Sequence, residues 1–192
     1  MNRRKFLAAA AGITSVFSGC ISIGGRSASG PTRSPACEKD LDPIRADPLE
    51  ILPEPVDGFK LSVRPQSITI GGTLTAQLTN TTSEEKGTRP STVYDIQHNV
   101  DGRWESIFQT DQRAWISPQH NHLPGEGFTW NLKMSRQELT VTEPDRGDTE
   151  RYVCEPLTPG RYRFVYWGVE LPDKPESDVD YALAEEFSLV SS

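Results

Sequence analysis

The chain has 192 residues, of which 35% are hydrophobic and 24% are charged, so it is long enough for one domain with a sizeable core. Its 27 acidic residues outnumber its 20 basic residues, which gives a net charge of −7. This balance argues against nucleic acid as a partner, because neutralising phosphates requires a basic surface. It also argues against electrostatic docking on anionic lipid.

The N-terminus has the layout of an export signal. Arg3, Arg4 and Lys5 precede a stretch without charges that extends to Gly19. A basic head followed by a short apolar segment is typical of a signal peptide. The apolar segment is too short to cross about 30 Å of hydrocarbon as a helix. We therefore predict export rather than a transmembrane anchor.

Two short motifs define this signal further. Arg3-Arg4, followed by Lys5-Phe6-Leu7, resembles the twin-arginine motif, which directs folded proteins across the membrane. Phe17-Ser18-Gly19-Cys20 resembles a lipobox, in which the cysteine receives lipid, although Phe17 stands where Leu, Val or Ile is usual. A signal anchor or simple cleavage remains an alternative. The resemblance implies a signal peptide over residues 1–19 and a lipoprotein held by Cys20 on the outer face of the cytoplasmic membrane.

Loss of residues 1–19 would remove three basic residues and no acidic ones, and would take the net charge to −10. Of the basic residues, 14 are Arg and only 6 are Lys. An acidic surface with few lysines resembles the proteins of halophilic archaea, where twin-arginine export of lipoproteins is common. An ordinary acidic secreted protein is the alternative.

Cys37 and Cys154 remain once Cys20 is assigned to lipid. An even pair of cysteines in an exported protein predicts a disulfide. On the chain-entropy model, closing a loop of this length stabilises the fold by at most about 4–5 kcal/mol. Two independent thiols are the alternative.

Residues 20–56 are rich in Gly, Ser and Pro and have no hydrophobic periodicity, which predicts a flexible tether. Residues 57–192 consist of short alternating runs bounded by turn residues, which predicts an all-β domain of seven to eight strands. The alternating residues of these runs are Phe59, Leu61 and Val63; Leu74, Ala76 and Leu78; Tyr94, Ile96 and His98; Trp104, Ser106 and Phe108; Phe128, Trp130, Leu132 and Met134; Tyr162, Phe164 and Tyr166; and Leu183, Phe187 and Leu189.

One gap separates these runs, between Ser135 and Pro156. Ser135, followed by Glu138 three residues later, predicts a capped helical turn. The polar stretch of residues 143–151 predicts an exposed loop.

Four motifs in order resemble bacterial immunoglobulin-like (Ig-like) domains. They are a Gly-initiated strand that ends in Asn (Gly72 to Asn80), a hairpin Asp101-Gly102-Arg103-Trp104, a strand start Pro124-Gly125-Glu126, and Pro159-Gly160-Arg161-Tyr162-Arg163. Within the last motif, Tyr162 resembles a tyrosine corner, whose hydroxyl bonds back to the nearby backbone. The resemblance implies an Ig-like β-sandwich displayed at the cell surface, and it supplies no catalytic residues. The gap with its cysteine is longer than such domains usually have.

Metal sites and catalytic centres are poorly supported by the residue patterns. A blue-copper site needs two His, a Cys thiolate and a weak axial ligand, but neither His nor Met follows Cys154. His120 and His122 would share one face of a strand, yet three protein ligands are needed for a convincing zinc site and His98 is distant in sequence. We interpret this segment as a polar loop. The chain lacks the common catalytic motifs. We therefore predict no enzyme, no metal and no cofactor.

Two positions are candidates for modification or binding. Asn80-Thr81-Thr82 is an N-glycosylation sequon at a predicted strand end. If Tyr162 faces the core, Arg163 and Trp167 face outward together, which would form a patch for a partner or a sugar. The alternative is that Trp167 packs under the loop of residues 168–180.

These features together predict a membrane-tethered, non-catalytic Ig-like module for binding or structure. Its expected partners are the membrane, through Cys20, and an envelope protein or glycan. An accessory or sensor subunit of an envelope complex is one alternative, and a metal-binding or redox lipoprotein is another.

Overall fold

The computed structural model describes residues 37, 40–44, 49–111, 118–142, 150–171 and 180–191. All of them belong to one compact unit, Pro31–Ser192, while the other unit, Met1–Gly30, lies outside the described residues. Within the described ranges, no helix is long and apolar enough to cross a membrane.

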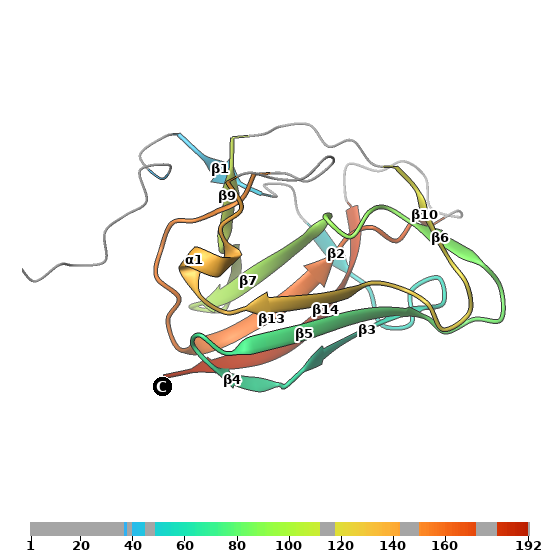
Figure 1. Ribbon diagram of the computed structural model, residues 1–192, viewed down its shortest axis with the longest axis horizontal. Helices are drawn as coiled ribbons and strands as arrows, with labels where there is room; N and C mark the ends of the chain where they lie inside the picture. The colour runs from blue at the N-terminus through green and yellow to red at the C-terminus, as the bar shows by residue number, and fades with distance from the viewer. Residues whose placement is uncertain are drawn as a thin grey trace, which may run out of the picture. The chain divides into compact units, whose positions relative to one another are not determined.

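Two sheets, one antiparallel and one mixed, form the body of the domain (Figure 1). The first has the order β11 (Thr129–Lys133), β5 (Thr73–Asn80) and β3 (Phe59–Arg64). The second has the order β2 (Leu49–Ile51), β14 (Asp180–Val190), β13 (Gly160–Tyr166), β7 (Tyr94–Val100) and β8 (Arg103–Ser106), and β4 (Ser67–Thr69) also pairs with β14. The pairings of β2 and β4 with β14 are parallel. The all-β sandwich predicted from the alternating runs is confirmed.

The inward faces of the two sheets supply the core. Along β3 and β5, buried and more exposed residues alternate, as the period of a strand requires. Trp130 lies at the centre, with ring centroids 4.9 Å from Phe164 and 5.5 Å from Tyr166. Burial of each large apolar side chain stabilises the fold by about 1.5–3 kcal/mol. The side chains with no exposed surface include Phe59, Leu61, Leu74, Leu78, Ile96, Phe108, Phe164, Tyr166 and Leu183.

The predicted hairpin at Asp101-Gly102 joins β7 to β8. Both residues have positive φ, 50° and 85°, as a two-residue turn between twisted strands requires. The run after Trp104 was predicted to continue as one strand, but it breaks at Ile107. Phe108 then begins β9 (Phe108–Thr110), which belongs to a different small sheet.

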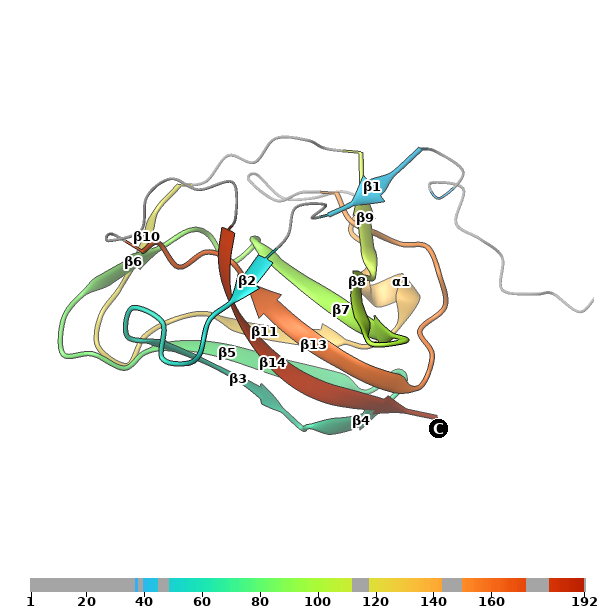
Figure 2. The same ribbon diagram turned by 180° about the vertical axis from the view of Figure 1, so that it is seen from behind.

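The prediction of a flexible tether up to residue 56 is wrong for its second half. Residues 42–43 form β1 (Asp42–Pro43), which pairs with β9, and β2 pairs with β14 (Figure 2). Ile44 and Val56 are buried in the core. Paired segments of only two or three residues are too short to show a hydrophobic period, so their Pro-rich composition dominated the prediction.

The gap between the predicted strands contains α1 (Arg136–Leu139) and β12 (Tyr152–Val153), which pairs with β9. The predicted cap is present, since Ser135 Oγ accepts a hydrogen bond from the Glu138 N–H at 3.4 Å. Residues 143–149 lie outside the described residues. Arg151 does not belong to an exposed loop as predicted, because it is buried with its guanidinium carbon 4.3 Å from the centroid of the Tyr94 ring.

Candidate functional site

The predicted export and lipidation residues, Arg3, Arg4 and Cys20, lie outside the described residues. The predicted disulfide is present between Cys37 and Cys154, with Cα atoms 5.6 Å apart. Both cysteines are buried in a small cluster with Tyr152. The sulfur of Cys154 is therefore bonded to sulfur, and it is not the thiolate that a copper site would need.

The predicted binding patch is only half correct. Trp167 is 4% exposed, so it does not form an outward patch with Arg163. The alternative, burial under residues 168–180, falls largely on residues 172–179, which lie outside the described part of the chain. Strand parity placed Trp167 on the outer face, but it could not show that this part of the face is covered.

A different tryptophan lies beside Arg163. Trp104 on β8 pairs with Asn99 of β7, and Arg163 on β13 pairs with Gln97 of β7. Because Asn99 and Gln97 are two residues apart on one strand, Trp104 and Arg163 lie on the same, outward face of the sheet. The guanidinium carbon of Arg163 lies 4.6 Å from the Trp104 ring centroid. That of Arg161 lies 5.8 Å from the same centroid, within the range of a cation–π interaction. We call Trp104, Arg161 and Arg163 the Arg–Trp face.

Each arginine of this face is held by one neighbour. Arg161 Nη2 forms an ion pair with Glu186 Oε2 at 2.7 Å. Arg163 Nε donates to Gln97 Oε1 at 2.7 Å, and Gln97 Nε2 donates to Asp95 Oδ2 at 3.0 Å. A chain of hydrogen bonds therefore runs from the outward face to a carboxyl group inside the protein.

Asp95 at the end of this chain has no exposed surface. Burial raises the pKa of Asp95 to about 7, although hydrogen bonds with Ser106 and Gln97 oppose the rise. Ser106 Oγ lies 2.9 Å from both Asp95 Oδ1 and Phe108 O. A hydroxyl carries one hydrogen and cannot donate to both oxygens. A protonated Asp95 resolves the conflict by donating to Ser106 Oγ.

A shallow hollow of about 340 Å³ adjoins the Arg–Trp face. Its walls come from β13, β14 and the residue that precedes β4. They are largely polar, and they comprise Gln66, Arg161, Glu186, Phe187 and Ser188. The face therefore combines fixed cations, an indole ring and side chains that can bond to hydroxyl groups.

A second hollow of about 330 Å³ lies on the other side of β8, between this strand and residues 154–158. Glu105 and Glu155 line it together with apolar residues such as Leu157. His98 at its wall stacks on Tyr162, with ring centroids 4.4 Å apart. Most of this lining is apolar or already engaged in packing, so we regard it as the weaker candidate.

Tyr162 makes the contact that the predicted tyrosine corner requires. Its hydroxyl donates to Thr158 O at 2.8 Å and accepts from the Thr158 N–H at 3.3 Å. Burial raises the pKa of Tyr162, which keeps the hydroxyl protonated and able to donate. This contact fixes the start of β13, and hence the direction in which Arg161 and Arg163 leave the sheet.

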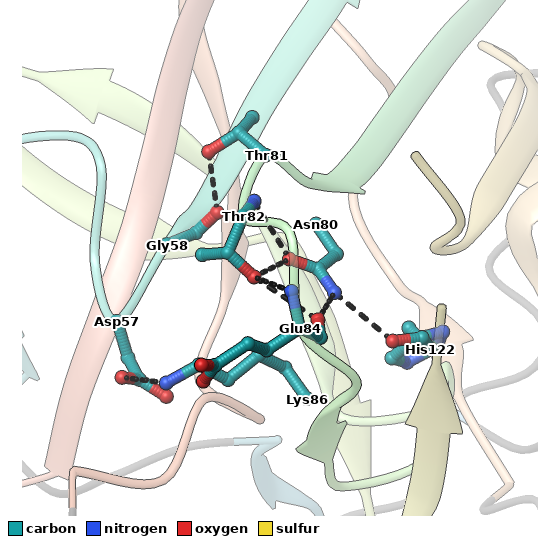
Figure 3. Close-up of polar contacts among 8 residues, drawn as sticks. All are labelled: Asp57, Gly58, Asn80, Thr81, Thr82, Glu84, Lys86 and His122. Atoms are coloured by element: carbon teal, nitrogen blue, oxygen red, sulfur yellow. Dashed lines mark hydrogen bonds and ion pairs between the residues drawn. The ribbon is translucent and has the colours of Figure 1, made fainter. Parts of the chain in front are cut away.

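Asn80, the candidate for N-glycosylation, has its side-chain amide engaged in hydrogen bonds in the folded domain (Figure 3). Asn80 has no exposed surface, and its Nδ2 donates to Glu84 O at 2.7 Å and to His122 O at 3.0 Å. Its Oδ1 accepts from the Thr82 N–H and from the Thr82 hydroxyl. The Asn-x-Thr pattern is a sequon in the sequence. In the structure, its side chains form the hydrogen bonds that hold the loop of residues 80–84 together.

The histidine pair is not in a polar loop as interpreted, because it forms the short strand β10 (His120–His122) opposite β6 (Lys86–Thr88). His122 is buried against Phe128, with ring centroids 4.6 Å apart, and burial lowers its pKa. Thr88 Oγ1 donates to Arg89 O, so His122 Nε2 donates to Thr88 Oγ1 at 2.9 Å.

Among the described residues, no group of three or more His, Cys, Asp or Glu is placed to hold a metal ion.

Sequence reasoning missed Trp104 and Asp95 as members of a site. Trp104 was recognised only as part of the Asp101-Gly102-Arg103-Trp104 hairpin and of the alternating run that follows it. The alternation that places Arg163 outward also places Trp104 outward, if the two strands are known to lie in one sheet. Asp95 carries no such signal, because an acidic residue in a strand is expected to be exposed.

No protein-family model matches the sequence, and no curated protein matches it. Solved structures that are similar in part include a β-glucosidase from Listeria innocua, with 13% identity and a TM-score of 0.33 over 68% of this chain and 16% of that one. A β-glucosidase from Erythrobacter marinus matches with 15% identity and a TM-score of 0.32 over 69% of this chain and 15% of that one. The chain thus spans about one-sixth of each, and similarity at this level supports no functional inference.

Proposed function

We propose that the protein is an extracytoplasmic lipoprotein, held by lipid on Cys20 at the outer face of the cytoplasmic membrane, whose Ig-like β-sandwich is a non-catalytic binding or structural module. The disulfide between Cys37 and Cys154 is the observation that carries this proposal. Structural disulfides persist in oxidising compartments and are rare in reducing cytosol. The twin-arginine and lipobox motifs at Arg3, Arg4 and Cys20 supply the route and the anchor.

The disulfide also sets the length of the tether. Because Cys37 is bonded to Cys154 and β1 pairs with β9, the tether that the sequence predicts is limited to residues 20–37. A flexible chain of this length has an end-to-end distance of roughly 23 Å. We infer that the domain is held close to the membrane surface.

A binding role is favoured over catalysis by the environment of the reactive groups. Asp95 has a raised pKa, but it has no exposed surface and is bonded to Ser106 and Gln97. Cys154 is in the disulfide. The groups that do reach the surface together are those of the Arg–Trp face, and they suit recognition. The tyrosine corner at Tyr162 supports the Ig-like type of the sandwich.

The anchor is tested by cell fractionation of the full chain and two variants. Wild-type protein is expected in the membrane fraction, released by detergent but not by high salt. Cys20→Ser, which keeps the export signal, is expected in the medium or in the soluble extracytoplasmic fraction. The double variant Arg3→Lys/Arg4→Lys is expected to accumulate inside the cell as the uncleaved precursor.

Mass spectrometry of the wild-type N-terminal peptide supplies an independent measurement, since lipidation adds the mass of the acyl or alkyl chains to Cys20. The proposal is contradicted if Cys20→Ser stays with the membrane as fully as the wild type, or if Cys20 carries no lipid.

A further inference from the structure

The Arg–Trp face keeps hydrogen-bonding capacity that the fold does not use. Arg163 Nε donates a hydrogen bond to Gln97, and the terminal nitrogens of Arg163 make no hydrogen bond with any described residue. Arg161 spends Nη2 on Glu186, with side chains 63% and 53% exposed. Arg163 is partly buried, with its guanidinium fixed at Nε. Terminal nitrogens without other hydrogen bonds are the paired donors that bind a carboxylate in two parallel hydrogen bonds.

Trp104 holds these cations in place before any ligand arrives. Both guanidinium groups lie within 6 Å of its ring centroid, so each side chain has already lost part of its conformational freedom. Binding costs less when the contacting side chains are ordered beforehand. The indole also adds apolar area to a polar face, which suits a ligand with both C–H and O–H surfaces.

The adjoining hollow contributes neutral hydrogen-bonding groups. Gln66 and Ser188 line it beside Arg161, in about 340 Å³ of open space. The hollow lies over β13 and β14, whose backbone groups are paired with each other along seven residues. A peptide that adds a strand to a sheet needs a free edge, which this position does not offer. A ligand at this position would therefore be bound by side chains. Polar side chains of this kind suit a ligand that is rich in hydroxyl groups.

The charge of the face limits the ligand further. Arg161 and Arg163 are partly offset by Glu186, which leaves a net charge of about +1. One excess cation matches one carboxylate of a ligand at a time.

We propose that the Arg–Trp face and its adjoining hollow bind an acidic carbohydrate, a chain of sugar rings that carry carboxylate groups. The carboxylate pairs with Arg163, a ring lies against Trp104, and hydroxyl groups bond to Gln66 and Ser188. This inference rests on the proposed function in one respect, namely that the domain is a binding module.

The test is calorimetric titration of the purified full chain with polygalacturonate and with its fully methyl-esterified form, which has the same sugar backbone without the charges. Wild type is expected to bind polygalacturonate, and to bind the ester at least about tenfold more weakly, because charge-assisted hydrogen bonds are lost. Arg163→Gln and Trp104→Ala are each expected to weaken binding of polygalacturonate about tenfold.

Arg103→Gln is the matched control, because it removes the same charge from β8 at an exposed position next to Trp104 but on the opposite face of the strand. Its affinity should stay within twofold of wild type. Unfolding curves of the variants check that Trp104→Ala is folded. If Trp104→Ala is not folded, Arg163→Gln carries the test, because it keeps a polar side chain at that position.

Three outcomes overturn the inference: no binding of polygalacturonate by the folded wild type, equal loss in Arg103→Gln, or equal binding of polyglutamate, which would identify an acidic peptide as the ligand. Cys20→Ser separates this inference from the proposed anchor. It should bind polygalacturonate as wild type does, whichever fraction of the cell contains it.

Discussion

The loop around Asn80 and the Arg–Trp face are both rich in polar side chains, but they use them in opposite ways. The side-chain amide of Asn80 donates hydrogen bonds to Glu84 O and His122 O, and its oxygen accepts one from Thr82. Asn80 has no exposed surface. Arg163 spends one nitrogen on Gln97, and its end is not engaged by described residues. The first region therefore stabilises the fold, while the second retains groups that can bind a ligand.

This difference shows why a motif and a site are not the same. The pattern Asn80-Thr81-Thr82 carries a signal in sequence, yet its amide is consumed by the loop that it closes. The Arg–Trp face carries no signal in sequence, since Trp104 and Arg163 are nearly sixty residues apart. The number of hydrogen-bonding atoms left over after folding distinguishes the two regions.

The largest expected effect is from Asn80→Ala. Loss of the amide leaves His122 O without its partner in a buried position, and Glu84 O and the Thr82 N–H without theirs in partly buried positions. We expect the free energy of unfolding to fall by about 4 kcal/mol, measured by denaturant titration.

Asn131→Ala is the matched control, because this amide is exposed and accepts one hydrogen bond, from Thr75 Oγ1 at 2.9 Å. Asn131→Ala should lower the free energy of unfolding by no more than about 0.5 kcal/mol. Equal costs at the two positions would contradict the assignment of Asn80 to the stability of the fold.

The second effect depends on pH and concerns the buried carboxyl group of Asp95, which is bonded to Arg163 through Gln97. The pKa of Asp95 is raised to about 7 in the folded protein, above its value in the unfolded chain. The folded state therefore binds this proton more tightly, so its contribution to stability is greatest at low pH and is lost as the pH rises from about 4 to 7. The loss is on the order of 4 kcal/mol, because each unit of pKa difference corresponds to about 1.4 kcal/mol.

Asp95→Asn should remove this dependence, because an amide can donate to Ser106 Oγ and accept from Gln97 Nε2 as the protonated carboxyl does. We expect the difference in unfolding free energy between variant and wild type to shift in favour of Asp95→Asn as the pH rises from 5 to 8. A difference that stays constant over this range would show that Asp95 is ionised throughout.

The smallest expected effect on stability is from Arg161→Gln. Its ion pair with Glu186 is more than half exposed, and such pairs contribute between zero and about 1 kcal/mol. Thermal unfolding at low and high salt should therefore differ little between variant and wild type. A loss as large as that of Asn80→Ala would mean that the Arg–Trp face is part of the structural framework rather than a free surface.

The residues that build the sandwich are largely readable in sequence. Phe59, Leu61 and Val63 alternate with more polar residues, and all three lie buried in β3 as predicted. The positive-φ turn at Asp101-Gly102 and the contact of Tyr162 with Thr158 follow from local patterns as well. These features depend on periods and spacings within a few residues of each other, which a single sequence displays.

Only half of the candidate site could be predicted from local sequence patterns. Arg163 was predicted to face outward from the parity of β13, and it does lie beside Trp104 on that face. Trp167 has the same parity but is buried. Parity gives the side of a sheet and not what packs on it, because the residues that cover a face can come from distant parts of the chain.

The sequence by itself determined that this protein is an all-β sandwich with a pair of cysteines suited to a disulfide, because strand periods, turn residues and cysteine parity are local or compositional properties. Only the tertiary structure decided which polar groups remain free. Asn80, Asp95 and Trp167 are buried, while Trp104 meets two arginines, since these outcomes depend on which strands become neighbours and on which faces are then covered.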